Sequence, residues 1–259
     1  MARIKLTGYT DEVSYREGDT VRVMVSAEGT TEAQVEIVRL VHGDEHPDGP
    51  GFIEERVPSG VSGTVPVRRQ FVDLGSRVDV DDPQGLLAGQ GAFTLHAFVF
   101  PTTPLKGRQA ILSRWALHET AGYGLGINPS GYLEFWVGDG SGIDAIAAEV
   151  PLVHHTWYFV AATYDAGSGS ATIRQEAVVN PYNGRLGKVA PYDHSSLVRQ
   201  KLRVKPKGGD RPFRFAGATM HAALRGTFNE LRFNGKIDRC GVQGRVLTDD
   251  ELAALAKGG

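Results

Sequence analysis

Apolar and polar residues alternate along most of this 259-residue chain, and this period of two constrains its fold more than any other feature. An extended strand places successive side chains on opposite faces, so alternation is typical of strands with one buried face. The pattern predicts strands at residues 20–26, 34–41, 76–80, 93–100, 132–137, 157–164, 171–174 and 229–233. Turn signals such as Asn128-Pro129-Ser130-Gly131 fall between them. We therefore expect an all-β sandwich of short antiparallel strands.

One helix carries a full set of end signals, and it lies near the last residue. Thr248 and Glu251 have the spacing of a capping box, in which each side chain accepts a backbone N–H of the other. Leu247 and Leu252 occupy the positions of a hydrophobic staple, and Gly258 is a stop signal. These residues predict one short C-terminal helix over 247–255.

Turn-forming residues between Gly43 and Gly51 divide the chain into two regions. We expect an N-terminal β-strand region at 1–66 and the main sandwich at 67–259. A region of about 65 residues with few large apolar side chains is marginal alone. We therefore expect residues 1–66 to pack on the sandwich.

Charge and composition exclude several classes of protein. The formal net charge of −2 excludes a globally basic nucleic-acid binder. No run of about 18 apolar residues is present, so no membrane span is expected. The first residues lack the apolar stretch of a signal peptide, and Cys240 is the only cysteine. Together these features predict a cytoplasmic location.

Common catalytic motifs are missing. The chain has neither a Gly-X-Ser-X-Gly nucleophile elbow nor a P-loop. Glu17-Gly18-Asp19 has half of a glycosidase-like carboxylate spacing, but Val21 and Met24 stand where the second glutamate is needed. We therefore predict no catalytic residue.

The densest set of metal-ligand types is His42-Gly43-Asp44-Glu45-His46. His42, Asp44 and His46 are candidate ligands for zinc or iron, because imidazole and carboxylate suit such ions. His-X3-His pairs usually need a helix, which Gly43 and Pro47 disfavour. A hydrogen-bonded surface turn is the alternative interpretation.

Two further groups of polar residues contain the side-chain types of metal ligands. Asp79, Asp81 and Asp82, or Asp139 and Asp144, are candidates for calcium on a sandwich rim, although acidic residues are ordinary at turns. His154 and His155 precede a strand, where an extended backbone directs adjacent rings to opposite sides. No site is predicted at this histidine pair.

A basic stripe runs through residues 199–207. Arg199, Lys201, Arg203, Lys205 and Lys207 alternate with less polar residues, which places the charges on one face of an extended strand. The first four are our candidates for binding an anionic partner surface, and the apolar Phe213, Phe215 and Leu224 are added to this contact surface. The alternative is a solvated edge that the cations protect from strand pairing.

A first resemblance covers about residues 70–259. The segments 93–101, 111–115 with 122–125, 156–165 and 233–238, followed by the helix, resemble the laminin-G-like, concanavalin A-like jelly roll. This resemblance implies a fold and leaves function open, because that fold hosts lectins, enzymes and adhesion modules.

A narrower resemblance includes the N-terminal region. Gly8-Tyr9 with Asp11, Gly18-Asp19-Thr20, residues 39–44 and Gly49-Pro50-Gly51 are similar to the start of the large subunit of the N,N-dimethylformamidase family. The similarity continues through Thr102-Thr103-Pro104, Ser113-Arg114-Trp115, residues 138–142, Val178-Val179-Asn180 and Asn234-Gly235-Lys236.

The narrower resemblance implies a cytoplasmic bacterial enzyme that cleaves dimethylformamide to dimethylamine and formate. It also implies a mononuclear iron held by tyrosines and a glutamate, in a large subunit that is accompanied by a small one. The family's large subunit is far longer than this chain, and none of its iron ligands maps onto it. We therefore expect no cofactor in this chain, with the iron in the family's downstream catalytic region.

Three hypotheses follow. In the first, the chain is a non-catalytic jelly-roll region that packs against the catalytic region or other subunits of a homo- or hetero-oligomer. In the second, it is a carbohydrate-binding module, with calcium as an optional ligand and Tyr123, Trp136, Tyr182 and Tyr192 as stacking residues. In the third, it is a hydrolase with a site at His42, Asp44 and His46.

Overall fold

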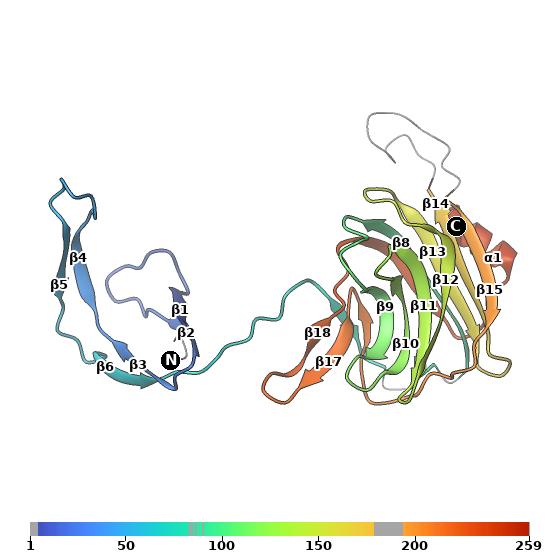
Figure 1. Cartoon of the computed structure of the whole chain (residues 1–259), viewed down its shortest axis with the longest axis horizontal. Coiled ribbons are helices and arrows are strands. Elements are labelled where there is room, and N and C mark those ends of the chain that lie inside the picture. The colour runs from blue at the N-terminus through green and yellow to red at the C-terminus, as the bar shows by residue number, and fades with distance from the viewer. Residues whose placement is uncertain (1–4, 83–84, 86, 90, 179–193, 259) are drawn as a thin grey trace. The chain divides into compact units, whose positions relative to one another are not determined.

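A computed structural model describes residues 5–82, 85, 87–89, 91–178 and 194–258. Within these residues the chain divides into two compact units, Met1–Val72 and Asp73–Gly259. The first unit contains strands only, and the second is a β-sandwich with one helix (Figure 1). The packing of residues 1–66 on the sandwich stays a prediction.

The first unit consists of three two-stranded antiparallel sheets. The first sheet pairs β1 (Lys5–Thr10) with β2 (Val23–Glu28). The second pairs β3 (Glu32–Val35) with β6 (Gly63–Pro66), and the third pairs β4 (Val38–Gly43) with β5 (Phe52–Arg56). The alternation at 34–41, predicted as one strand, is divided between β3 and β4, because each half pairs with a different partner.

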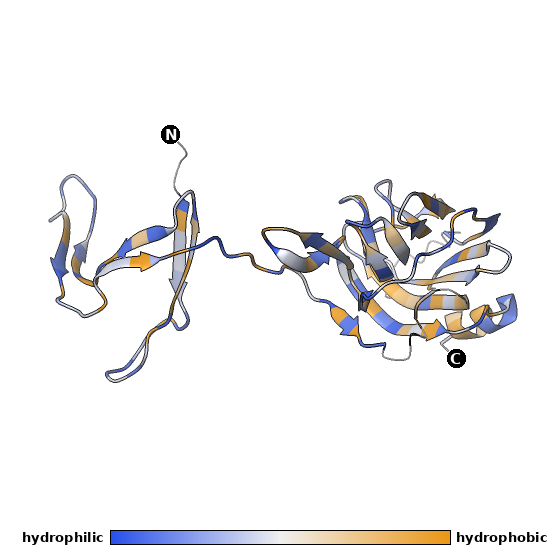
Figure 2. Ribbon diagram, turned by 90° about the horizontal axis from the view of Figure 1, so that it is seen from below, coloured by the Kyte–Doolittle hydropathy of each residue, from blue (hydrophilic) through white to orange (hydrophobic). Residues whose placement is uncertain are grey.

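This unit has almost no core. Among its described residues only Ala27 is buried. Large apolar side chains are exposed on the β1–β2 and β4–β5 ribbons and in the segments that flank the strands: Leu6, Tyr9, Val13, Val21, Val23, Met24, Ile37, Val38, Leu40, Val41, Phe52, Ile53, Val57 and Val61. Figure 2 shows hydrophobic and hydrophilic residues alternating along the strands of this unit. Two-stranded ribbons are marginal in water unless another surface covers them.

The second unit packs two antiparallel sheets face to face. The five-stranded sheet has the order β15-β14-β13-β8-β19: β8 (Ala92–Pro101), β13 (Tyr158–Asp165), β14 (Ser170–Ala177), β15 (Ser196–Lys201) and β19 (Gly235–Gln243). The larger sheet has the order β12-β11-β10-β9-β16-β7: β7 (Val78–Val80), β9 (Gln109–Ala116), β10 (Ala121–Ile127), β11 (Tyr132–Asp139), β12 (Ile143–Pro151) and β16 (Phe213–Phe215). The all-β sandwich prediction is confirmed.

A hairpin of β17 (Ala218–Ala222) and β18 (Gly226–Glu230) extends the larger sheet. It joins β9 through the parallel pairing of Thr219 with Ala116. Figure 1 shows this hairpin projecting from the edge of the sandwich.

The core forms from every second residue of facing strands, as the alternation requires. On β8, Leu95, Ala97 and Val99 point inward, and they meet the aromatic and branched side chains of β10, β11 and β13. Tyr123 and Phe135 are among the largest fully buried side chains.

The predicted helix is α1 (Asp249–Ala256), and its capping box is formed as expected. Thr248 accepts the N–H of Glu251, and Glu251 accepts the N–H of Thr248. Leu252 packs on Phe159 and Ala161, so α1 covers the outer face of the five-stranded sheet. Within the described residues, no helix has the length and apolarity that a membrane span requires.

Candidate functional site

A pocket of about 320 Å³ lies where the β17–β18 hairpin meets the turn after β9 and the segment 207–212. Its polar lining residues are His118, Glu119, Lys207, Asp210, Arg211, Thr219, His221 and Thr227. None of these was predicted as a site, apart from Lys207 as the last cation of the basic stripe.

Two histidines form one wall of the pocket. The ring centroids of His118 and His221 are 5.7 Å apart. The backbone N–H of His221 donates to Nδ1 of His118 at 3.2 Å, which requires the proton of the His118 ring on Nε2. That Nε2 lies 3.4 Å from a carboxylate oxygen of Glu119. On the other ring, Nδ1 of His221 lies 3.2 Å from the hydroxyl of Thr227.

A buried guanidinium, that of Arg211, also lines the pocket. Arg211 donates to the carbonyl of Ala121 at 2.5 Å, to Gly208 O at 3.2 Å and to Glu119 at 3.1 Å. The side chain of Arg211 is 5% exposed, so these hydrogen bonds replace the water that would otherwise stabilise its positive charge. Glu119 therefore connects Arg211 with His118.

Three buried polar atoms of the β17–β18 hairpin have no hydrogen-bond partner among the described residues, and Thr219, which carries one of them, lines the pocket. They are Oγ1 of Thr219 and both side-chain polar atoms of Asn229. Thr219 and Asn229 are direct cross-strand neighbours in the hairpin, 6% and 0% exposed. Gly217 leaves room for the amide, because a Cβ there would lie 2.0 Å from Oδ1 of Asn229.

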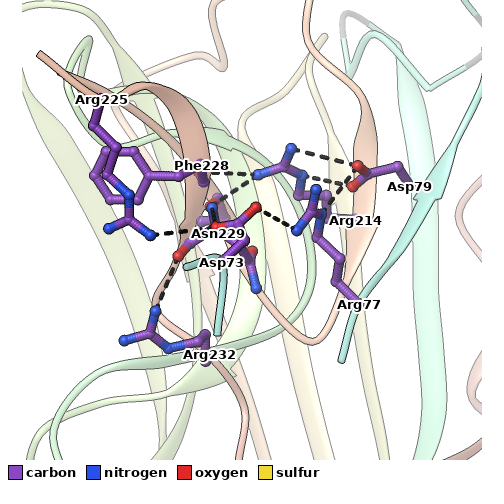
Figure 3. Close-up of polar contacts among 9 residues, drawn as sticks. Asp73, Arg77, Asp79, Arg214, Arg225, Phe228, Asn229 and Arg232 are labelled. Carbon is purple, nitrogen blue, oxygen red and sulfur yellow. Dashed lines mark hydrogen bonds and ion pairs between the residues drawn. The ribbon is translucent and has the colours of Figure 1, made fainter. Parts of the chain in front are cut away.

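An arginine–aspartate network holds the start of the sandwich unit (Figure 3). Asp73 accepts hydrogen bonds from Arg77 at 2.7 Å, from the N–H of Asn229 at 3.3 Å and from Arg225 at 3.4 Å. Burial alone would raise the pKa of Asp73, but the bonds from Asn229 and Arg77 lower it below its usual value. Arg214 bridges Asp79 to carbonyl oxygens of the hairpin.

The candidate metal ligands at 42–46 form a hydrogen-bonded turn. The N–H of His46 donates to Asp44 at 2.9 Å, and the N–H of Asp48 donates to the ring of His46 at 3.2 Å. Nδ1 of His42 lies 3.2 Å from Gly51 O. In the described part of the chain, no three His, Cys, Asp or Glu side chains are grouped so that they could hold a metal ion.

The basic stripe lies on the outermost strand of the five-stranded sheet. Arg199 and Lys201 of β15 are exposed, as are Arg203 and Lys205 beyond it, whereas the intervening Leu202 is buried. Arg199 pairs with Asp249 at the start of α1. All four predicted partner-binding residues are exposed, and partner binding itself stays a prediction.

Two of the four aromatic residues proposed for sugar stacking are unsuitable. Tyr123 and Trp136 are buried, and the hydroxyl of Tyr123 donates to Leu87 O at 2.7 Å. Tyr182 and Tyr192 lie outside the described residues, as do Val179 and Asn180. The prediction that Phe213 belongs to an apolar contact surface is wrong, because its side chain is buried. Leu224, at the tip of the hairpin, is 91% exposed.

The expectation that the rings of His154 and His155 point to opposite sides is wrong. Their Nδ1 atoms are 3.2 Å apart. His155 has a φ of 58°, a left-handed conformation, so the strand geometry behind that expectation does not apply. Its ring stacks on Phe100 at 5.8 Å.

Of the calcium candidates, Asp79, Asp82, Asp139 and Asp144 have protein partners. Asp79 pairs with Arg77 and Arg214, and Asp82 pairs with Arg114 at 2.5 Å. The hydroxyl and N–H of Ser141, with the N–H of Gly142, lower the pKa of Asp139 to about 2. Each of these contacts is typical of structural ion pairs and turns.

Comparison with known proteins supports both resemblances. The family model of the concanavalin A-like lectin/glucanases superfamily matches residues 74–194. The chain is 40% identical over 263 aligned positions to the N,N-dimethylformamidase beta subunit of Paracoccus aminophilus, and 38% identical to that of an Alcaligenes species. Each alignment covers 100% of this chain and 34% of the relative, so the chain spans about a third of the length of these relatives.

Among solved structures, the chain is similar to the CBM40 domain of a Ruminococcus gnavus IT-sialidase. The TM-score is 0.50 at 16% identity, and the match covers 71% of this chain and 95% of that domain. At this identity the likeness concerns the fold alone.

Proposed function

We propose that this chain is a non-catalytic assembly region of an amide-hydrolysing enzyme related to N,N-dimethylformamidase. The observation that carries the proposal is the identity of 38–40% to two N,N-dimethylformamidase beta subunits over all of this chain. Because the chain matches only about a third of each relative, we assign the chemistry to a region that this sequence does not contain.

The first unit supports a role in assembly. The β1–β2 and β4–β5 ribbons expose apolar side chains on both strands, and Ala27 alone is buried among the described residues of the unit. Such ribbons gain stability when a second surface covers them. We propose that this surface belongs to the sandwich and to the catalytic region or other subunits of a cytoplasmic oligomer.

The basic stripe supplies a second contact surface. Arg199, Lys201, Arg203 and Lys205 are four exposed cations within seven residues, and Arg199 pairs with Asp249 of the same chain. Like charges on one surface attract an acidic partner and speed its association. We propose that this stripe faces an acidic surface of the catalytic region.

The buried tyrosines do not fit the iron centre that the resemblance implies. The hydroxyls of Tyr123 and Tyr164 donate to backbone carbonyls, and that of Tyr158 accepts the N–H of Val153. Burial raises the pKa of all three phenols, which disfavours the phenolate that an iron–tyrosine bond needs. We therefore propose that the iron is held elsewhere in the enzyme.

A mixing experiment tests the assembly role. The purified chain is combined with the Paracoccus aminophilus beta subunit shortened by its matched third, and binding is followed by analytical ultracentrifugation. We expect a complex that weakens roughly tenfold when Lys201→Glu and Arg203→Glu reverse the stripe. The matched control reverses Lys236 and Arg239 on β19, at the opposite edge of the same sheet. The absence of any complex, or equal weakening by both variants, would count against the proposal.

A further inference from the structure

We infer that the pocket beside the β17–β18 hairpin binds a small uncharged molecule whose polar group both donates and accepts hydrogen bonds. A hydroxyl and a carboxamide share this chemistry. The inference rests on the geometry of the pocket and does not depend on the proposed assembly role.

The unpartnered hydroxyl of Thr219 defines the hydrogen bonds that such a ligand would complete. A hydroxyl both donates and accepts hydrogen bonds, so the polar group of the ligand must be able to do the same. Thr219 lines the pocket while its residue is only 6% exposed. Buried polar groups are rarely left without partners, because water no longer compensates them.

The strand register places these atoms on one polar face of the hairpin. Thr219 pairs with Asn229, and His221 pairs with Thr227 two residues further along. Residues two apart on a strand share a face, so both pairs lie on the same side. Thr219, His221 and Thr227 all line the pocket, which therefore presents a continuous polar surface.

The charges around the pocket are balanced. Lys207 and Arg211 are matched by Glu119 and Asp210, and Arg211 already pairs with Glu119 at 3.1 Å. An anion would meet the carboxylates and a cation would meet the guanidinium. An uncharged ligand avoids both repulsions, and its polar group still forms a hydrogen bond with the hydroxyl of Thr219.

The volume of the pocket limits the size of the ligand. A cavity of about 320 Å³ is at the lower end of the range for small-molecule sites. It suits a molecule of a few heavy atoms better than an extended chain.

NMR titration of the full chain with isosteric probes tests this inference. Acetamide and glycerol are the uncharged probes, one for each source of the chemistry, and acetate and methylammonium are the charged controls. We expect saturable shifts of the amide signals of Thr219, His221 and Thr227 with at least one uncharged probe, and none with acetate. Equal shifts with acetate, or no saturable shift with either uncharged probe, would overturn the inference; the latter result would mean that water alone occupies the site.

A substitution at Thr219 separates ligand binding from folding. Thr219→Val keeps the shape and removes the hydroxyl, so we expect probe binding to weaken about tenfold. The same change should raise the melting temperature of the probe-free protein, because a buried unpaired group is lost. Thr219→Ser retains the hydroxyl and should retain binding. Unchanged binding by Thr219→Val, or a lower melting temperature, would contradict the inference.

Discussion

Arg214 of β16 donates from Nε to a carboxylate oxygen of Asp79 on β7 at 2.6 Å, and the two residues are direct cross-strand neighbours. The Arg214 side chain is 5% exposed and that of Asp79 is 34% exposed. The same guanidinium donates to Ala218 O and Phe228 O at 3.3 Å each. One side chain therefore links β7, β16 and the β17–β18 hairpin (Figure 3).

Removing this guanidinium should destabilise the sandwich. Arg214→Met leaves Asp79 with one arginine fewer and removes one donor from each of two carbonyls, so we expect the free energy of unfolding to fall by about 2 kcal/mol. Urea denaturation measures it. Arg239→Met is the control, because Arg239 and Asp238 are exposed and 3.8 Å apart. A change below about 0.5 kcal/mol at Arg214, as expected for an exposed pair, would contradict the assignment.

Gly124 is required by the packing of Trp136. A Cβ at Gly124 would lie 2.3 Å from a ring carbon of Trp136, whose ring is buried. We expect Gly124→Ala to lower the free energy of unfolding by about 1–3 kcal/mol, because the core must shift. The control is Gly142→Ala, where a Cβ meets no atom within 4 Å. Equal stability of the two variants would show that Trp136 moves freely.

His96 should make stability depend on pH. Burial lowers the pKa of its imidazole below 6.5, so the folded state disfavours the charged form. As pH falls below 6.5, the unfolded chain binds a proton that the folded chain does not, and stability decreases. We expect this loss between pH 7 and pH 5 to be smaller in His96→Gln than in the original chain. Denaturant titrations at both pH values measure it, and an identical loss would contradict this role of His96.

The two units should differ when they are produced separately. Residues 73–259 contain a large buried core, and residues 1–72 contain Ala27 as their one buried described residue. We expect cooperative thermal unfolding of the 73–259 fragment and no cooperative transition in the 1–72 fragment, measured by circular dichroism. A cooperative transition in residues 1–72 alone would mean that they need no partner surface.

Local signals in the sequence were reliable, as α1 shows. Thr248 and Glu251 are three residues apart and create the helix start themselves, so no distant contact is needed. The sequence pattern likewise located β8 and β13, and Tyr158, Val160 and Ala162 of β13 face the core. The opposite face of β13 is also buried, because α1 covers Phe159 and Ala161. Alternation does not specify strand partners, which is why the division between β3 and β4 was not predicted.

The pocket could not be predicted because its residues are distant in sequence. His118 and His221 meet only after β17 pairs with β9, and nothing near either residue signals the other. The burial of Thr219 and Asn229 without partners is a property of packing, which no sequence pattern records. For His154 and His155 the missing information was the left-handed φ of His155.

Dimethylamine release from N,N-dimethylformamide by the purified chain, supplied with iron, tests the central claim most directly. The account predicts no release above that of the buffer with iron alone, because the chemistry is assigned to a region outside this sequence. Release that depends on the concentration of the chain would contradict it and would place an amide-cleaving site within these 259 residues.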